Sequence, residues 1–451
     1  MTPARTICLG FLMVITVGAI LLMLPISLTN HQWSDPITAL FISTSAVCVT
    51  GLSVIDVGKY YSFFGEFVVA LLAQIGGLGY MTATTFLLLI LGRRFGLKDK
   101  LALQQSLDMP GISGVLQLVK SIIGATLLFE LTGAFLLLGV FVPKLGWNLQ
   151  AIWFSVFHSV SAFNNAGFGL YTDSFMKFVE SPLLNFTITG LIIFGGIGYQ
   201  AIMEVFFWAR SLLGRHHVAS LRPDRFMFSL NFKIVTTTTL ALLVIGTVAI
   251  LITEFNNPAT LGNLSWNGKL LAAWFQSVTT RTAGFNTIDN GKLGSAALFV
   301  TIALMFVGAS PGSTGGGIKT TTIRILTGVT RAVLQGQSSV ILFNRQIPMA
   351  LIMKAIAVFL GSLSVVVVST ILLTLLDPTI PFVQLFFEVV SAFATVGLST
   401  GITAQLSMGG KLVLIGTMYI GRVGILLLMS TLISENARSV IRYPEEELLV
   451  G

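Results

Sequence analysis

Four short turns of similar sequence interrupt an otherwise apolar chain, and each turn has one glycine near its centre. They read AVCVTGLSV, AFNNAGFGL, TTRTAGFNT and AFATVGLST, and their glycines are Gly51, Gly167, Gly284 and Gly397. A glycine lets extended backbone point successive carbonyl oxygens to one side, because it takes dihedral angles that a side chain disfavours. Carbonyl oxygens arranged in this way can replace the water shell of a cation. The turns therefore suggest a cation site built from backbone.

The candidate cation ligands are each of these glycines and the two residues before it. We call these four three-residue segments the glycine turns. They are Val49, Thr50, Gly51, Asn165, Ala166, Gly167, Thr282, Ala283, Gly284, Thr395, Val396 and Gly397. The glycines are 116, 117 and 113 residues apart, and an aromatic residue stands ten positions before each one, at Phe41, Phe157, Trp274 and Phe387. Such regular spacing indicates four copies of one unit.

The elements that position these turns must be membrane helices. Of the 451 residues, 54% are hydrophobic and only 10% are charged, and the mean hydropathy is +0.89. No ordinary water-soluble domain of this size has such a composition. Apolar runs long enough to cross about 30 Å of hydrocarbon occur near residues 6–28, 65–92, 115–142, 183–209, 232–254, 294–323, 350–376 and 409–434. The sequence predicts one transmembrane helix for each run, and the first is expected to be retained rather than cleaved.

Each segment between aromatic residue and glycine is too short to span and is interpreted as a re-entrant half-helix. Non-helical backbone survives at membrane depth only inside protein or along a watery cavity, so the four turns are expected to converge on one axis. The predicted fold is an all-α integral membrane protein with four parallel span–pore–span repeats, eight transmembrane helices and four re-entrant pore helices around one pseudo-fourfold ion path. The expected units are residues 1–100, 101–225, 226–340 and 341–451.

Topology follows from the basic residues, because lysines and arginines near span ends stay on the cytoplasmic side. Most of the 26 lysines and arginines fall on one side of the predicted spans, the side of both termini. Both termini are therefore expected to be cytoplasmic, in a multi-pass protein of the plasma (inner) membrane. The net charge of +8 needs no nucleic acid to explain it, since basic loops beside anionic lipid are ordinary in membrane proteins.

The stretch GASPGSTGGGIKTTT, residues 308–322, interrupts the sixth predicted span with one proline and five glycines. Breakers at this density cannot sustain a helix, so an intramembrane loop is expected, either a gate or a flexible kink. The candidate gate residues are Gly312, Ser313, Thr314, Gly315, Gly316, Gly317, Lys319 and Arg422. A Walker A phosphate loop is excluded because Ile318 separates Gly317 from Lys319 and no strand precedes it. Lys319 is either a mobile charge in the loop or a cytoplasmic anchor.

Two arginines lie at membrane depth. Arg422 is inside a predicted span, where an arginine is costly and faces the bundle interior or a cavity. It is interpreted as a barrier facing the pore, with a structural salt bridge as the alternative. Arg281 stands three residues before Gly284 and would repel a cation from the path. It is expected behind the turn, pinning carbonyls or pairing with an acid such as Glu388.

The remaining polar residues give no catalytic set. His158 and Asn164 are expected to be buried hydrogen-bonding supports, and so is the side chain of Asn165. Glu130 and Glu204 are interpreted as paired or snorkelling residues rather than as coupling carboxylates. His, Cys and carboxylates show no metal-ligand or nucleophile pattern, so the chain is not expected to be an enzyme. The rival function, an alternating-access secondary transporter, typically has inverted halves rather than parallel units.

The four repeats, together with IGGLGY at residues 75–80, FGGIGY at 194–199 and the stretch at 308–322, resemble the Trk/Ktr/HKT family of potassium transporters over nearly the whole chain. Within that family the chain is most similar to the membrane subunit of bacterial Ktr systems. The resemblance implies potassium uptake through four non-identical pore units, a homodimer, and regulation by a separate cytoplasmic nucleotide-binding ring (KtrA-like).

The resemblance also bears on ion choice. Some plant HKT members have serine in place of the first glycine and favour Na⁺, whereas Gly51 is glycine here, as are the other three. K⁺ is therefore the expected transported ion, and Na⁺ dependence stays open. The resemblance further implies that the 308–322 loop lies under the glycine turns and obstructs the path until the regulator moves it.

Overall fold

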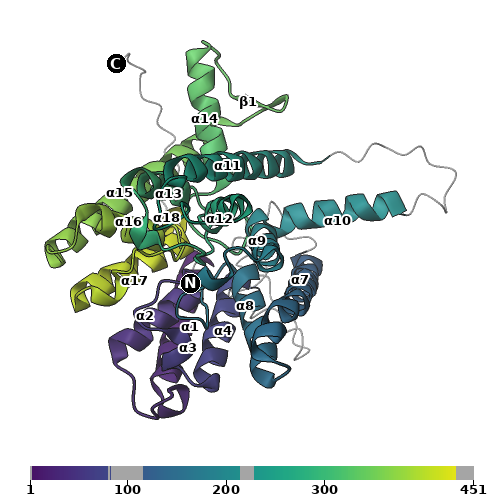
Figure 1. Cartoon of the computed structure of the whole chain (residues 1–451). Helices are drawn as coiled ribbons and strands as arrows, with labels where there is room; N and C mark the ends of the chain where they lie inside the picture. The colour runs from purple at the N-terminus through teal and green to yellow at the C-terminus, as the bar shows by residue number, and fades with distance from the viewer. Residues whose placement is uncertain (1–2, 80–81, 83–114, 214–227, 433–451) are drawn as a thin grey trace.

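The computed structural model describes residues 3–79, 82, 115–213 and 228–432, and the regular secondary structure of these residues is almost all helical (Figure 1). The helices are α1 Pro3–Met23, α2 Pro36–Val47, α3 Val57–Tyr60, α4 Phe63–Leu78, α7 Val115–Leu145, α8 Leu149–Phe163, α9 Pro182–Ile197, α10 Tyr199–Leu213, α11 Leu230–Glu254, α12 Trp266–Thr279, α13 Ser295–Phe306, α14 Thr320–Leu334, α15 Met349–Leu376, α16 Phe382–Phe393, α17 Met408–Val423 and α18 Ile425–Leu432. Short 3-10 turns occupy Pro25–Ser27, Met176–Phe178, Asn290–Lys292 and Thr403–Gln405. Among the described residues the one sheet is an antiparallel hairpin of β1 Ile341–Leu342 and β2 Arg345–Gln346.

Four long apolar helices, α1, α7, α11 and α15, are each long enough to cross a membrane, and the bent pair α9–α10 would make a fifth. Each long helix is followed by a short helix: α2, α8, α12 and α16 have 12 to 15 residues. Three of these short helices start at a side-chain cap, since Asp35, Asn148 and Ser265 accept hydrogen bonds from amides of the first turn. The order of long helix, short helix, turn and second helix recurs four times.

In three of the four sets the second helix is shorter than expected. We predicted continuous spans over 65–92, 183–209 and 409–434, but α4, α9 and α17 have only 16 residues each. In the other set, α13 ends at Phe306, before the loop that was expected to interrupt the 294–323 span. The helices α4, α9 and α17 end at Gly79, Gly198 and Gly424, whose φ values are +79°, +95° and +88°. A residue with positive φ cannot continue a right-handed helix, and glycine reaches this region without a side-chain penalty.

The breaks redirect the chain. At Gly198 the axis turns by 103° from α9 to α10, and after Phe306 the chain leaves the helix for the 308–322 loop before α14 begins. Some parts of the prediction lie outside the described residues. They are most of the predicted span beyond Gly79, the last two residues of the 409–434 span and the boundary expected at residue 100.

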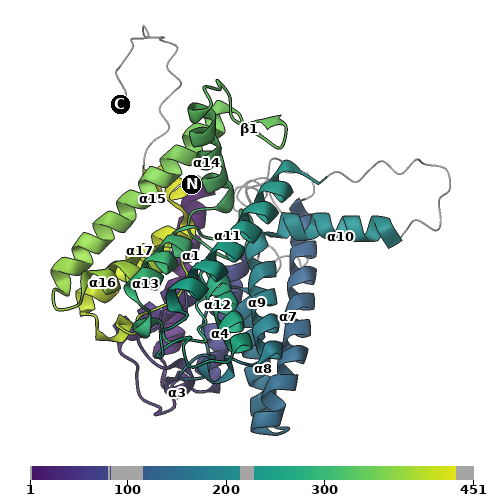
Figure 2. The same cartoon turned by 45° about the horizontal axis from the view of Figure 1, so that its top comes forward.

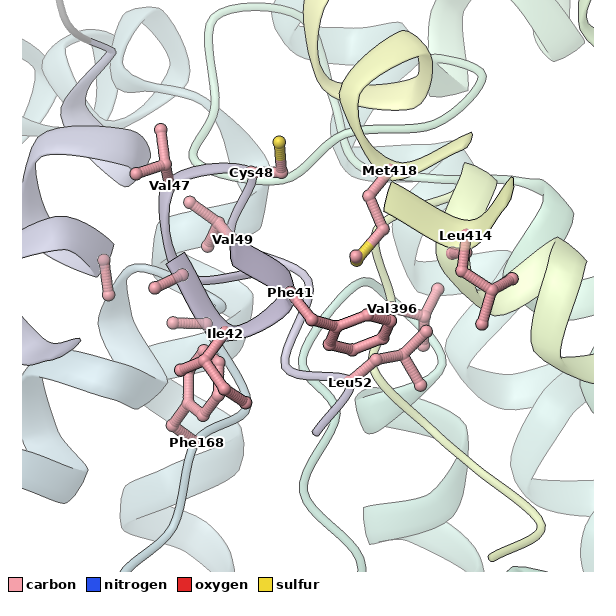
Figure 3. Packing of buried hydrophobic residues seen from close by; sticks show 14 of the residues in the cluster. Phe41, Ile42, Val47, Cys48, Val49, Leu52, Phe168, Val396, Leu414 and Met418 are labelled. Carbon is pink, nitrogen blue, oxygen red and sulfur yellow. The ribbon is translucent and has the colours of Figure 1, made fainter. Parts of the chain in front are cut away.

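Buried apolar side chains surround the ends of the short helices. Figure 3 shows Phe41 and Ile42 of α2 in one cluster with Leu52, Phe168 and Val396, each of which is next to a turn glycine. Leu414 and Met418 of α17 belong to the same cluster. Packing at native density leaves these side chains little freedom, so the core holds the backbone of the turns in place. In Figure 2 the hairpin and α14 extend beyond the beginnings of α11 and α15.

Candidate cation site

The four turn glycines form a closed ring. A Cβ atom built on Gly51 would lie 2.9 Å from the Cα of Gly167, one on Gly167 would lie 3.0 Å from the Cα of Gly284, and one on Gly397 would return to the Cα of Gly51 at 3.0 Å. Each such Cβ would also meet the carbonyl oxygen of the residue before the next glycine. Going round the ring, those oxygens belong to Ala166, Ala283, Val396 and Thr50, at 2.6, 2.7 and 2.8 Å for the first three. A side chain at any of the four positions would therefore collide with neighbouring backbone.

The four turns share one unusual backbone conformation. The glycines have φ values of +90°, +72°, +78° and +88°, and the residue two positions earlier is also positive in every turn. Those residues are Val49, Asn165, Thr282 and Thr395, with φ values of 57°, 57°, 71° and 52°. Three of the four are β-branched, and a β-branched residue in this region is a true outlier that costs on the order of 1–3 kcal/mol. One conformation in all four turns, strained in three of them, indicates a functional constraint on the backbone.

Hydroxyl residues near the ends of the short helices hold the turns. Ser45 Oγ accepts a hydrogen bond from Gly51 N at 3.0 Å, and Ser391 Oγ accepts one from Gly397 N at 3.1 Å. Ser161 and Thr279 instead donate to the carbonyls that follow the glycines, at 2.8 and 2.6 Å. Our sequence reasoning did not single out these four residues, although they recur at nearly the spacing of the glycines.

One face of the ring opens into a cavity of about 330 Å³ that is lined by all four glycines. The carboxylates of Asp56 and Asp289 also line it, and each forms an ion pair with a lysine, Lys59 at 3.5 Å and Lys292 at 3.4 Å. These carboxylates were missed from sequence, where an Asp–x–x–Lys pair looks like any solvated surface. The cavity lining thus includes two aspartates, each paired with a lysine.

The 308–322 loop lies against the other face of the ring. Gly316 N donates to Thr395 Oγ1 at 3.0 Å, and a Cβ on Gly315 would overlap Thr282 Oγ1. The backbone of Ser310 and Thr314 is bonded to carbonyls of the α9 end, Gly196 at 3.1 Å and Gly195 at 3.2 Å. The structure thus brings the candidate gate residues together with the residues that begin two glycine turns.

Three basic side chains hold this loop through carbonyl groups. Arg422 donates to Thr314 O and to Gly76 O at the end of α4. Arg281 donates to Val307 O at 2.6 Å and Gly308 O at 2.5 Å, where the loop begins, and Lys319 Nζ donates to Gly315 O at 2.8 Å. Among the described residues no carboxylate forms an ion pair with either arginine.

Of the two alternatives left open for Arg281, the structure shows the binding of carbonyls, and no pair with Glu388 forms. Glu388 is fully buried and accepts hydrogen bonds from Ser399 Oγ, from Thr400 N at 3.2 Å and from Thr403 Oγ1 at 3.1 Å. Its oxygens are already satisfied by the segment that leaves the fourth turn. Because these hydrogen bonds already satisfy the Glu388 carboxylate, it does not need the Arg281 guanidinium as a partner.

A second buried side chain plays the same part in another unit. His158 Nε2 accepts a hydrogen bond from Leu170 N at 3.2 Å, and Leu170 and Thr400 both stand three residues after their glycine. His158 and Glu388 each stand nine residues before it. Two different acceptors thus fix the backbone after the glycine, and His158 is a support as expected rather than a ligand.

The remaining polar candidates are hydrogen-bonded to other parts of the chain. Asn165 Nδ2 donates to Arg281 O at 3.2 Å and Thr282 Oγ1 at 3.1 Å, which ties the second turn to the third. Asn164 Nδ2 donates to Glu130 Oε1 at 2.9 Å. Glu204 accepts from the backbone and hydroxyl of Ser229 at the start of α11, away from the ring. No cluster of three or more His, Cys, Asp or Glu side chains suited to a metal occurs in the part of the chain that the structure describes.

Known proteins resemble this chain over most of its length. The model of a family described as "TrkH: Cation transport protein" matches residues 9–439. The chain is 41% identical to "Ktr system potassium uptake protein B" of Bacillus subtilis (strain 168), over 100% of this chain and 97% of the relative. It is 36% identical to "Potassium/sodium uptake protein NtpJ" of Enterococcus hirae, over 100% and 98% of the two chains.

Among solved structures, the potassium transporter TrkH from Vibrio parahaemolyticus matches with a TM-score of 0.71 over 94% of this chain and 84% of the other. The sequence identity there is 18%, so this match shows the fold. The family is one of transporters rather than enzymes. The family model, the full-length relatives and the shared fold together establish that the chain belongs to the TrkH family of cation transport proteins.

Proposed function

We propose that this chain takes up potassium across the plasma membrane through a filter of backbone carbonyls supplied by the four glycine turns. The observation that carries the proposal is the closed ring of four glycines, each with positive φ and each too close to its neighbour for a Cβ atom. A ring of this kind replaces the water shell of an entering cation without any charged ligand. The names of the relatives, which refer to potassium uptake, support the choice of ion.

In this proposal each of the four units contributes one quarter of the path. The long helix crosses the membrane, the short helix re-enters it, and the negative C-terminal end of the short helix faces the ring and favours a cation. The glycine cavity with Asp56 and Asp289 is the outer mouth, and the side with the 308–322 loop is the cytoplasmic one. Both termini are then cytoplasmic, in agreement with the distribution of basic residues.

The 308–322 loop is proposed as the gate, with Gly312–Gly317, Lys319 and Arg422 as its parts. Support comes from the contacts of Gly315 and Gly316 with the residues that begin the third and fourth turns. Arg422 adds a positive charge between the loop and α4. A loop so placed obstructs the path by volume, and the guanidinium obstructs it by charge.

Regulation is proposed to come from another polypeptide. The relatives named as parts of a Ktr system support a cytoplasmic nucleotide-binding partner that shifts the loop, with the chain working as a homodimer. The relative named as a potassium/sodium uptake protein supports a sodium dependence of transport.

The test is cation flux into liposomes that contain the purified full-length chain, with and without a cytoplasmic nucleotide-binding partner. Uptake of K⁺ that excess Na⁺ inhibits only weakly, and that the partner increases, is expected. A carbonyl filter should also pass Rb⁺ by electrodiffusion, with a direction that follows the electrochemical gradient of Rb⁺ alone. Flux that requires a counter-ion gradient at fixed stoichiometry would instead favour the alternating-access mechanism.

A further inference from the structure

A second cavity, of about 340 Å³, lies between α14 and the hairpin β1–β2. Its polar lining residues are Arg324, Thr327, Arg331, Gln335, Gln337 and Asn344. Neither aspartate nor glutamate is among its lining residues. Two positive charges therefore share one hollow, and neither forms an ion pair with a carboxylate in the described part of the chain.

The two arginines point to the same side of α14. They are seven residues apart, which is nearly two turns of helix and about 10 Å along the axis. Gly328 stands between them and also lines the cavity, and a Cβ there would lie 3.1 Å from Val340 and 3.3 Å from Leu342. The missing side chain lets the hairpin approach α14 closely and leaves the space between the guanidinium groups open.

One buried donor of Arg324 is unsatisfied. Its Nε atom is buried and has no hydrogen-bond partner among the described residues. A buried donor without an acceptor costs about 1–3 kcal/mol, more for a charged group. The forked geometry of a guanidinium matches the oxygens of a phosphate, so the two arginines that line the cavity suit a phosphate group.

The cavity lies at the start of two long helices. Ile234 of α11 and Ile352 of α15 form one buried cluster with Ala332 of α14 and Leu342 of the hairpin, and Figure 1 shows α14 and β1 beside these helices. If the path has the proposed orientation, the start of each helix is at the cytoplasmic surface. The cavity is then level with the headgroups of the inner leaflet, which is rich in anionic lipid.

Exposed apolar side chains flank the cavity. Leu334 at the end of α14 is 82% exposed, and Ile341 and Phe343 of the hairpin are 56% and 41% exposed. Ile341 and Phe343 also line the cavity. A basic hollow bordered by apolar side chains suits a molecule with a phosphate head and acyl chains better than it suits a free phosphate ion.

We propose that the cavity between α14 and the hairpin binds the phosphate of an anionic phospholipid from the cytoplasmic leaflet, with Arg324 and Arg331 as its ligands. The inference rests on the proposed orientation of the ion path. Because α14 follows directly on the 308–322 loop, a lipid held by Arg324 restrains the end of that loop. Anionic lipid then changes how readily the loop leaves the path.

The test measures lipid binding by the purified full-length chain in detergent, by native mass spectrometry, with added phosphatidylglycerol or phosphatidylcholine. Arg324→Gln with Arg331→Gln is expected to weaken binding of phosphatidylglycerol by roughly tenfold or more, and Arg331→Gln alone should weaken it less. The matched control is Arg345→Gln on β2, which removes one charge nearby from a residue that does not line the cavity. It should leave binding unchanged.

Three results would overturn the proposal: equal binding of phosphatidylglycerol by parent and double variant, an equal loss in Arg345→Gln, or complete displacement of the lipid by millimolar inorganic phosphate. The last result would assign the cavity to free phosphate. Gel-filtration profiles that match the parent show that the variants are folded. Since binding is measured without transport, a failure here is distinct from a failure of the potassium flux.

Discussion

Substitution of Gly51 by serine tests whether the ring selects the ion. A Cβ at this position would lie 2.6 Å from the carbonyl oxygen of Ala166 and 2.9 Å from the Cα of Gly167. Both are backbone atoms of the neighbouring turn, so the collision cannot be relieved by rotating a side chain. Either the carbonyl of Ala166 moves or the backbone at position 51 leaves its left-handed conformation, and both responses disturb the ring.

The size of the effect follows from the backbone. Holding a residue with a Cβ at the φ of +90° seen for Gly51 costs about 1–2 kcal/mol. If the ring keeps its geometry only when K⁺ is bound, that cost falls on the K⁺-bound state and not on a relaxed ring that accepts Na⁺. A difference of about 1–2 kcal/mol corresponds to a roughly 5- to 30-fold fall in the K⁺/Na⁺ flux ratio.

The assay is competitive flux into liposomes that contain equal amounts of parent or variant protein. Gly401→Ser is the matched control, because Gly401 has nearly the same φ, +91°, but nothing within 4 Å of its Cβ position. It carries the same backbone strain outside the ring and should keep the parental ratio. An unchanged ratio in Gly51→Ser, or an equal fall in Gly401→Ser, would refute a role of the ring in selection.

Three further predictions concern the loop, its supports and the fourth turn. Arg422→Ala is expected to raise flux in the absence of any partner, and so is shortening of the loop within Gly312–Gly316. The two changes together should be non-additive because both act on one path, and additive effects would place Arg422 outside that path. Arg281→Gln removes two charge-assisted hydrogen bonds and should lower the free energy of unfolding by about 2–4 kcal/mol in thermal denaturation, so an unchanged midpoint would contradict its anchoring of the loop. Glu388→Ala should lower the K⁺/Na⁺ ratio while Glu388→Gln, which keeps an acceptor for Thr400 N, largely preserves it; equal ratios in the two would exclude the hydrogen bond as the cause.

The turns were predictable from sequence because they combine a regular spacing with a physical need for glycine. Gly51 and its three counterparts must approach neighbouring backbone closely, which only glycine allows, so the residue type alone marks these positions. The Ser and Thr residues that hold the turns recur at a similar spacing, so the same comparison of the four units would have found Ser45, Ser161 and Ser391.

The broken second helices were not predictable in the same way. Gly79, Gly198 and Gly424 stand inside apolar runs, where a glycine is compatible with a continuous helix. Hydropathy measures the length of an apolar run and is blind to its direction, so a run that turns by 103° at Gly198 looks like one span. Gly79 and Gly198 belong to the motifs IGGLGY and FGGIGY that carried the resemblance. The local conformation at Gly198 depends on the loop that packs against it, since a Cβ on Gly198 would lie 2.6 Å from Pro311 O.

The two buried arginines show that the charge of a side chain does not by itself predict its partner. A search for an acid near Arg281 led to Glu388, whereas the structure gives both Arg281 and Arg422 only carbonyl partners among the described residues. A carboxylate beside either guanidinium would cancel the positive charge and could also bind K⁺ within the path. Carbonyl groups satisfy the donors and leave the charge in place. An unneutralised charge about 5 Å from a cation, at an effective dielectric constant of about 20, opposes it by on the order of 3 kcal/mol. In the gate that we propose, the loop therefore obstructs the path by volume and Arg422 obstructs it by charge, and opening must displace both.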